Sequence, residues 1–407
     1  MASPCIPRVR PHLQRQGERS GQTIRLLCAH LVMFALAVTS QAQTQTKPTS
    51  AELTPRPAVS AILEAFDKYE VVGMPAAHGL KDLDDFILAL IRNPAFPEKV
   101  NDIAVECGNS LYQPILDRYI AGEQVPFLEV QKAWRNTTQP MCGTSGFFEQ
   151  FFPLVRAINQ KLPAGKRLRV LAGDPPIDWD QVKTVGDTER FLLALDANIA
   201  SVMEKEVLSK HRRALMLFGT FHLMHDSGPG SAVTTYEKDY PNRTFVISNL
   251  AFFDLKSSTP SSNRFADWPV PSLAAAKRTW LGALDLSHFF PPFIGIDDDC
   301  KVSTESPNEV QKPMEELVDA FLYLGPTDLQ LREQMPADIA LDTKYMTESE
   351  RRLTLQGFPP DGFTSEASHE RIVRAAQNAI FTMPRPPDVN AMVQQCLDQK
   401  GRNSTPQ

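Results

Sequence analysis

The 407-residue sequence lacks several features that would place it in a familiar class of protein. It has no excess of basic residues, since 42 Lys and Arg face 48 Asp and Glu for a net charge of −6, so a basic surface for nucleic acid is not expected. No two cysteines are spaced as CxxC, which argues against a structural zinc site. No GxSxG sequence is present, which argues against an ordinary serine hydrolase.

The sequence also has no long apolar run suited to a membrane span. The apolar stretch from Leu26 to Val38 is too short for a comfortable span, but five arginines precede it and Ser40-Gln41-Ala42 offers small residues for cleavage. This pattern predicts a signal peptide over residues 1–42 and export to the periplasm or the extracellular space. Cleavage removes five arginines and one glutamate, lowers the net charge from −6 to −10 and leaves no stable membrane span.

Cysteine is scarce, and export to an oxidising compartment would allow the remaining cysteines to form disulfides. Two of the six cysteines would leave with the signal peptide, and four would remain: Cys107, Cys142, Cys300 and Cys396. An even number in an oxidising compartment permits two disulfides, through any of three pairings. Buried free thiols are the alternative.

Short apolar runs alternate with helical periodicity along most of the chain. The polar, proline-containing residues 43–60 are expected to form a disordered tether. A long amphipathic helix capped by Asp187 is predicted to run to Met203. Strands are predicted at residues 70–74, 102–106, 168–173, 214–218, 243–248 and 320–324. Because this alternation is typical of parallel sheets, we predict an α/β domain over residues 61–330 with a mostly parallel sheet flanked by helices.

The last two predicted strands are separated by a long irregular insertion, residues 251–313, with one helical piece near residues 273–284. Long connections of this kind often form the rim or lid of a functional site, although wrapping of the outer helices is the alternative. Three of its side chains are candidates to line the site: Trp268, Trp280 and His288. Residues 331–407 are predicted to form a C-terminal helical extension packed on the domain.

Ionisable side chains follow four of the predicted strands where each strand ends: His78, Glu106, Asp174 and His222. Because the carboxyl ends of parallel strands meet at one edge of a sheet, we expect these four to face one cavity. Histidines with carboxylates suit general acid–base catalysis or a small metal site. The alternatives are that each carboxylate caps the next turn or helix and that each histidine is a hydrogen-bonded loop residue.

The order of three short motifs resembles the superfamily that contains erythromycin esterases, ChaN-type haem-binding proteins and Tiki-type metalloproteases. The chain is similar to a divergent member of it, over residues 61 to about 250. The matching residues are Pro75-Ala76-Ala77-His78-Gly79, Ile103-Ala104-Val105-Glu106 with Tyr112-Gln113, and Gly219-Thr220-Phe221-His222.

The esterase branch of this resemblance implies that His78 is the general base that activates water, supported by Glu106. Asp174 and His222 join the predicted catalytic set because they also follow strand ends, and Asp174 or Glu106 is the candidate to substitute for the missing acid. His222 or His225 would polarise the carbonyl, with Gln113 and His225 as substrate-binding residues. The chain departs from the pattern at Ala76, where the acid of the GExH motif is expected, and a histidine without its carboxylate partner is less basic and less well oriented.

Three classes of function follow from these features. We favour an exported hydrolase of an ester or related acyl bond, because the predicted site is rich in acid–base groups. The second class is a non-catalytic protein of the ChaN type that binds haem, or a divalent metal at His78, Glu106 and His222. The third is a pseudo-enzyme that interacts with another protein. The partner is accordingly a small-molecule substrate or haem in the first two classes.

Overall fold

The computed structural model describes residues 53–76, 79–226, 230–251, 253, 264–290, 293–296, 299–305, 312–333, 335–357 and 389–403. The predicted signal peptide, most of the predicted tether and His78 lie outside these ranges. Among the described residues, no helix is both long enough and apolar enough to cross a membrane.

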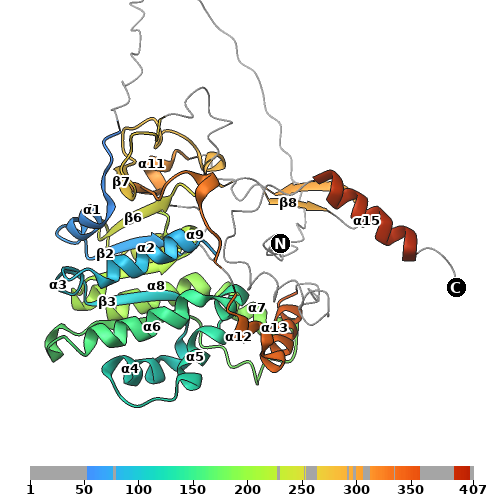
Figure 1. Cartoon of the computed structure of the whole chain (residues 1–407), viewed down its shortest axis with the longest axis horizontal. Helices are drawn as coiled ribbons and strands as arrows, with labels where there is room; N and C mark the ends of the chain where they lie inside the picture. Colours follow the sequence, from blue (N-terminus) through green and yellow to red (C-terminus); the bar gives the residue numbers. More distant parts are fainter. Residues whose placement is uncertain are drawn as a thin grey trace, which may run out of the picture.

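Eight strands form one sheet in the order β1-β7-β10-β6-β2-β5-β3-β4 (Figure 1). Their bounds are β1 Arg56–Pro57, β2 Val71–Pro75, β3 Asp102–Asn109, β4 Arg169–Asp174, β5 Ala214–Phe218, β6 Thr244–Asn249, β7 Ser272–Ala275 and β10 Ala320–Tyr323. The six strands from β10 to β4 pair in parallel, whereas β7 and β1 are antiparallel. The predicted α/β fold with a mostly parallel sheet is confirmed.

Helices cover both faces of the sheet, because alternate strand residues point into two cores. Leu215 and Leu217 of β5 belong to one core and Met216 and Phe218 to the other. The helices of the first core are α1 (Ala58–Ala65), α2 (Lys81–Arg92), α3 (Phe96–Lys99), α4 (Gln113–Ala121), α5 (Phe127–Arg135) and α6 (Gly146–Asn159). Those of the second are α8 (Leu195–Glu206), α9 (Thr220–Leu223), α10 (Ala232–Tyr236) and α11 (Met314–Leu317).

Two predicted helices differ from the structure. The helix from Asp187 to Met203 is two helices, α7 (Val185–Leu193) and α8, and Asp187 stands inside α7 in a capping box with Thr184. The helical piece at residues 273–284 is wrong, because β7 begins there and pairs with β10. An alanine-rich run of this length does not reveal its partner strand, and pairing in the sheet overrides its helix propensity.

Part of the predicted tether belongs to regular elements. Residues 56–57 pair with β7 and α1 begins at Ala58, so the predicted tether over residues 43–60 extends too far. The pairing involves only two residues, Arg56 and Pro57, a stretch too short to give a strand pattern in the sequence.

Two disulfides are present, Cys107–Cys142 and Cys300–Cys396, which is one of the three possible pairings. The second joins α15 (Val389–Asn403) to the turn of a hairpin formed by β8 (Phe293–Ile296) and β9 (Val302–Glu305). Within the predicted extension over residues 331–407, α13 (Thr343–Leu355) lies beside α7 and the end of α5, and α12 (Ala337–Leu341) packs on α13. Helix α15 lies beside β8 (Figure 1).

Candidate functional site

Glu106 lies at the carboxyl end of β3, where the strand is irregular. Pairing with β4 shifts between Val105, which faces Ala172, and Asn109, which faces Asp174, so β3 holds two extra residues there. Bulges of this kind change the direction of a side chain and are common beside active sites. Gly108 permits the close approach, since a Cβ there would lie 2.9 Å from the Cα of Ala172.

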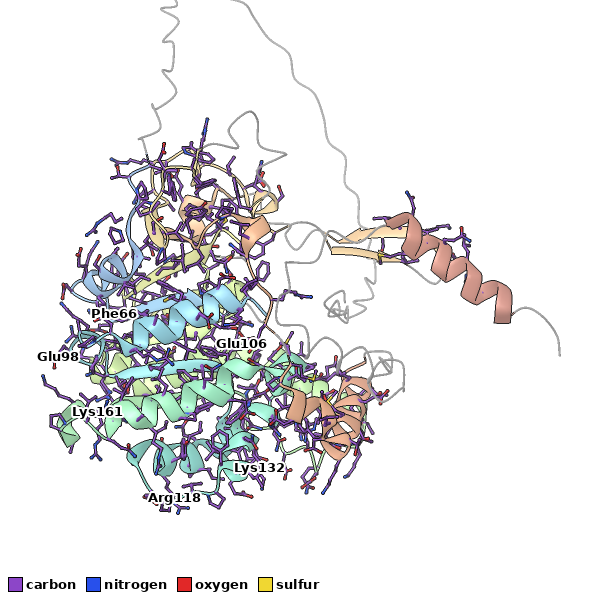
Figure 2. The ribbon with its side chains drawn as sticks, in the orientation of Figure 1. Phe66, Glu98, Glu106, Arg118, Lys132 and Lys161 are labelled. Carbon is purple, nitrogen blue, oxygen red and sulfur yellow. A yellow bond between two sulfur atoms is a disulfide. The ribbon has the colours of Figure 1, made fainter. Side chains whose placement is uncertain are left out.

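The Glu106 carboxylate faces the end of β5. Its Oε2 accepts a hydrogen bond from the backbone N–H of Gly219, the residue between β5 and α9. Glu106 is only 4% exposed, and Figure 2 shows it at the opposite end of the sheet from Phe66 and Glu98. The carboxylate therefore lies at the carboxyl edge of the parallel strands, where ligands bind in folds of this type.

His222 stands in α9 between two carboxylates. Its Nδ1 hydrogen-bonds Oδ1 of Asp196 at 2.8 Å, and its Nε2 lies 3.8 Å from Oε1 of Glu106. Asp196 comes from the first turn of α8 and also accepts a 2.8 Å hydrogen bond from the N–H of Ala232. The imidazole is thus fixed in orientation by Asp196 and directed toward Glu106.

Asp196 was missed in the sequence. As an acid in the first turn of a helix it has an ordinary role at the helix N-terminus, and nothing local connects it to His222. Its contact with His222 depends on how α8 and α9 pack on the same face of the sheet. In the structure, Asp196 lies just after the break between α7 and α8, which precedes Leu195. The sequence gives no sign of this break.

The surroundings of His222 favour its charged form. Burial lowers the pKa of the imidazole, but the hydrogen bond to Asp196 and the charge of Glu106 outweigh burial and raise the pKa to about 9. At neutral pH both ring nitrogens of His222 therefore carry protons. The site combines a buried carboxylate with an imidazolium, which are a proton acceptor and a proton donor.

Asp174 lies close enough to Glu106 and His222 for their charges to influence its pKa. Burial raises the pKa of this fully buried carboxyl well above its usual range, against the lowering effect of its hydrogen bonds from Thr138. The backbone N–H of Thr138 donates to Oδ2 at 2.8 Å, and the Thr138 hydroxyl donates to Oδ1. Both hydrogen bonds come from a turn 36 residues earlier in the chain, so the predicted alternative, in which Asp174 caps the turn after its own strand, does not describe it.

The structure thus brings together three of the four residues predicted to share a cavity: Glu106, Asp174 and His222. The fourth, His78, lies outside the described residues, and so do its contacts. The predicted catalytic roles of all four stay predictions at this point.

Gln113 and His225, the predicted substrate-binding residues, make structural contacts. Gln113 occupies the outer edge of β4, where its amide donates to the Val170 carbonyl at 2.8 Å and accepts from the Ala172 N–H at 2.7 Å. His225 lies between Glu237, 2.8 Å from Nδ1, and Asp319, 3.0 Å from Nε2.

These contacts engage both ends of the Gln113 amide and both ring nitrogens of His225. Burial lowers the pKa of His225, but Asp319 and Glu237 raise it to about 9. The carboxylate partners of His225 are different from those of His222, so the two histidines form separate clusters. His225 is therefore poorly placed to polarise a substrate beside Glu106.

No three His, Cys, Asp or Glu side chains among the described residues are arranged to hold a metal ion. The predicted metal ligands include His78, which is not described, so the haem and divalent-metal alternatives are unchanged as predictions.

The insertion over residues 251–313 reaches the site through Phe290. Its ring centroid lies 5.0 Å from that of Phe221, the residue before His222. Trp268 and Trp280 were predicted to line the site, but both pack on the second core, in contact with Phe265. Their aromatic surface is better buried there than at a rim. The third candidate, His288, pairs with Asp285 at 3.2 Å.

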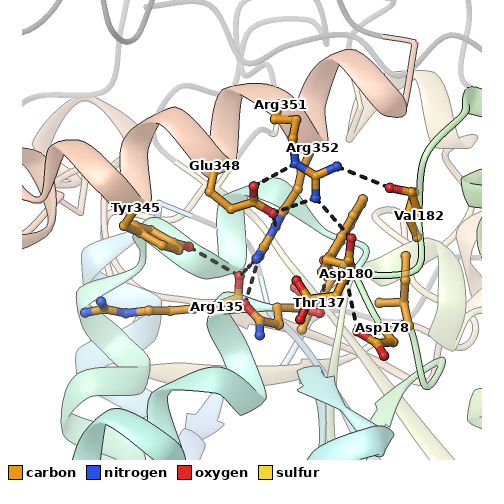
Figure 3. Close-up of polar contacts among 12 residues, drawn as sticks. Arg135, Thr137, Asp178, Asp180, Val182, Tyr345, Glu348, Arg351 and Arg352 are labelled. Atoms are coloured by element: carbon orange, nitrogen blue, oxygen red, sulfur yellow. Dashed lines mark hydrogen bonds and ion pairs between the residues drawn. The ribbon is translucent and has the colours of Figure 1, made fainter.

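Helix α13 holds the turn that supplies Thr138 to Asp174. Arg352 donates to the Arg135 carbonyl at 2.8 Å and to Asn136 Oδ1 at 2.9 Å (Figure 3). Gln356, just after α13, donates to the Thr138 carbonyl at 2.5 Å. Arg351 donates to the carbonyls of two residues after β4, Trp179 and Val182, and Glu348 pairs with both arginines (Figure 3). The C-terminal extension therefore braces two loops next to the site.

No family model matches the sequence, and no curated protein matches it. Among solved structures, a Bacillus cereus protein shares 12% identity at a TM-score of 0.44, over 70% of this chain and 97% of that one. An erythromycin esterase mutant in its open conformation shares 11% identity at a TM-score of 0.39, over 66% and 95%. A succinoglycan biosynthesis protein shares 9% identity at a TM-score of 0.43, over 68% and 95%.

An erythromycin esterase is thus among the solved structures with some similarity to this chain. All three TM-scores are below 0.5, so these similarities carry no argument about function. What the protein does has to be argued from the residues at the carboxyl edge of its sheet.

Proposed function

We propose that this chain is a hydrolase of an ester or related acyl bond, with Glu106, His222 and Asp196 at its centre. One observation carries the proposal. His222 is fixed through Nδ1 by Asp196 at 2.8 Å and directs Nε2 toward the buried carboxylate of Glu106, 3.8 Å away. A proton donor and a proton acceptor on one edge of a parallel sheet are the groups that acyl hydrolysis needs.

In the proposed reaction, Glu106 accepts one proton and His222 donates one. Glu106 takes a proton from water as the water oxygen attacks the carbonyl carbon of the ester. His222 gives its Nε2 proton to the alkoxide as the carbon–oxygen bond breaks, which leaves a carboxylic acid and an alcohol. Passage of the proton from Glu106 back to His222 restores the starting state. His78, the general base implied by the resemblance, is proposed only to assist in activating the water, because it is less basic without the acid expected at position 76, where Ala76 stands.

Asp196 acts as a positioning residue in this scheme. It holds the Nδ1 proton of His222, so that the proton released to the alkoxide comes from Nε2. Axial ligation of haem by His222 would occupy Nε2, the atom that gives up the proton in the proposed hydrolysis. The acid–base pair that Nε2 forms with Glu106 favours hydrolysis over the haem alternative.

The test compares the purified mature chain with its His222→Gln variant on a panel of simple esters. We expect the rate to fall by about 10²- to 10⁴-fold, the usual contribution of a positioned acid or base. His211→Gln is the matched control, because the His211 side chain is 77% exposed and its rate should be unchanged. A folded wild-type protein that hydrolyses none of the esters would refute the proposal.

We extend the proposal to the compartment and place the protein outside the cytoplasm. Both pairs of cysteines left after signal cleavage form disulfides, which persist in oxidising compartments. Free-thiol titration of unfolded protein from exported and cytoplasmic preparations tests this. If the cytoplasmic preparation also contained no free thiols, the disulfides would no longer support a location outside the cytoplasm.

A further inference from the structure

Exposed apolar side chains lie near the His222–Asp196 pair on α9, which holds His222, and on α7, which directly precedes the helix of Asp196. Phe221, beside His222 in α9, is 38% exposed. On the other side, Leu192 is 36% exposed and Leu193 is 79% exposed, and both stand in the last turn of α7. Exposed apolar side chains that gather around one site are typical of ligand-binding surfaces, whereas single ones need no explanation, so the placement of these three decides the matter.

The geometry of the α7–α8 junction places the two leucines next to Asp196. Ala194, between the helices, keeps a right-handed helical backbone, and its carbonyl accepts a 2.8 Å hydrogen bond from the Asn198 N–H. The chain therefore keeps its helical direction, and Leu192 and Leu193 precede Asp196 by about one turn. Helical side chains lean toward the N-terminus, so the Asp196 carboxylate lies over the turn that holds both leucines.

Phe221 is held from behind by the insertion. Its ring contacts the ring of Phe290 at a centroid distance of 5.0 Å, and Phe290 packs on the second core. Phe221 is therefore held in place by Phe290, while part of its ring remains exposed to solvent. The site has apolar surface on the α9 side, from Phe221, and on the α7 side, from Leu192 and Leu193.

We propose that Phe221, Leu192 and Leu193 form an apolar lip that selects esters of apolar alcohols. The inference rests on the proposed function. Because His222 protonates the departing alkoxide in that scheme, the side chains around His222 contact the alcohol part of the ester. These three residues are specificity-determining and take no part in the proton transfers.

The test measures acetate release from ethyl, butyl and hexyl acetate, which share one acyl group and differ only in the alcohol. For the wild type, kcat/KM should rise about fourfold with each buried methylene. Phe221→Ser and Leu193→Ser should flatten this dependence. Phe221→Leu should restore it, because leucine is also apolar.

Leu128→Ser is the matched control. Leu128 is 74% exposed, about as much as Leu193, but belongs to α5 on the other face of the sheet. Its variant should keep the wild-type dependence on chain length. A flat dependence in the wild type, or an unchanged one in both lip variants, overturns this inference alone. If the folded protein hydrolyses no ester, both the proposed function and the inference about the lip are refuted.

Discussion

At the scale of single residues, His222 decides how the site depends on pH. Burial lowers its pKa, but Asp196 and Glu106 raise it to about 9, so the proton donor is present below that pH and lost above it. We expect the rate of ester hydrolysis to decline on the alkaline side with an apparent pKa near 9. In Asp196→Asn this limb should move to lower pH, as measured from kcat/KM between pH 6 and 10.5.

The same shift predicts how stability depends on pH. A histidine whose pKa is raised by folding contributes its full stabilisation below the unfolded value, about 6.5, and loses it as pH rises through about 9. For His222 this amounts to about 3 kcal/mol of unfolding free energy, measurable by urea titration at pH 6 and pH 9.5. An Asp196→Asn variant with the wild-type difference between these pH values would contradict the assignment.

Two other residues show the limit of inference from sequence at this scale. Glu106 was identifiable because it ends a buried strand, and His222 because it follows one. Asp196 and Thr138 were not, because their contacts with His222 and Asp174 join residues that are far apart in the chain. Contacts between residues so far apart in the chain depend on how the helices and strands pack, and a local sequence pattern does not reveal that packing.

At the scale of elements, the disulfide Cys107–Cys142 joins the residue after Glu106 to the 3-10 helix after the Thr138 turn. We expect the Cys107→Ala/Cys142→Ala variant to lose about 4 kcal/mol of unfolding free energy, given a sequence separation of 35. Ester hydrolysis should fall at least about tenfold where the variant is still folded, because Glu106 and Asp174 lose a shared support.

The second disulfide supplies the control for that prediction. Cys300–Cys396 joins α15 to the β8–β9 hairpin. Its Cys300→Ala/Cys396→Ala variant should keep the ester hydrolysis rate of the wild type. Equal losses of rate in the two double variants would show that general destabilisation, and not the position of Glu106, is responsible.

The elements themselves were predictable to different degrees. Six parallel strands were found because buried strands are short apolar runs bounded by turn residues. The two antiparallel strands were missed, because β1 has only two residues and β7 resembles a helix in composition. Helix α13 was expected only as part of an extension, and its grip on the Thr138 turn depends on single arginine and glutamine contacts.

At the scale of the whole molecule, two parts of the C-terminal region have different surroundings. Helix α13 contacts the loops beside the site, whereas α15 contacts β8. We expect a chain ending at Gly357, with Cys300→Ser, to keep the ester hydrolysis rate and the melting temperature of the domain within a few degrees. A chain ending at Pro336 also lacks α12 and α13 and should lose both, as measured by thermal melting and ester assays. Similar behaviour of the two truncations would contradict a bracing role for α13.

The strand order has a consequence for when this chain can fold. β5 lies between β2 and β3, pairing Ala214 with Val71 on one side and with Asp102 on the other. The two earlier strands are therefore partners of a segment synthesised long after both. Pairing between segments so distant in sequence makes folding slow, since a long loop must close before any contact stabilises it. The export proposed above requires the chain to stay unfolded until it has crossed a membrane, and this topology delays formation of the central sheet until β5 is available.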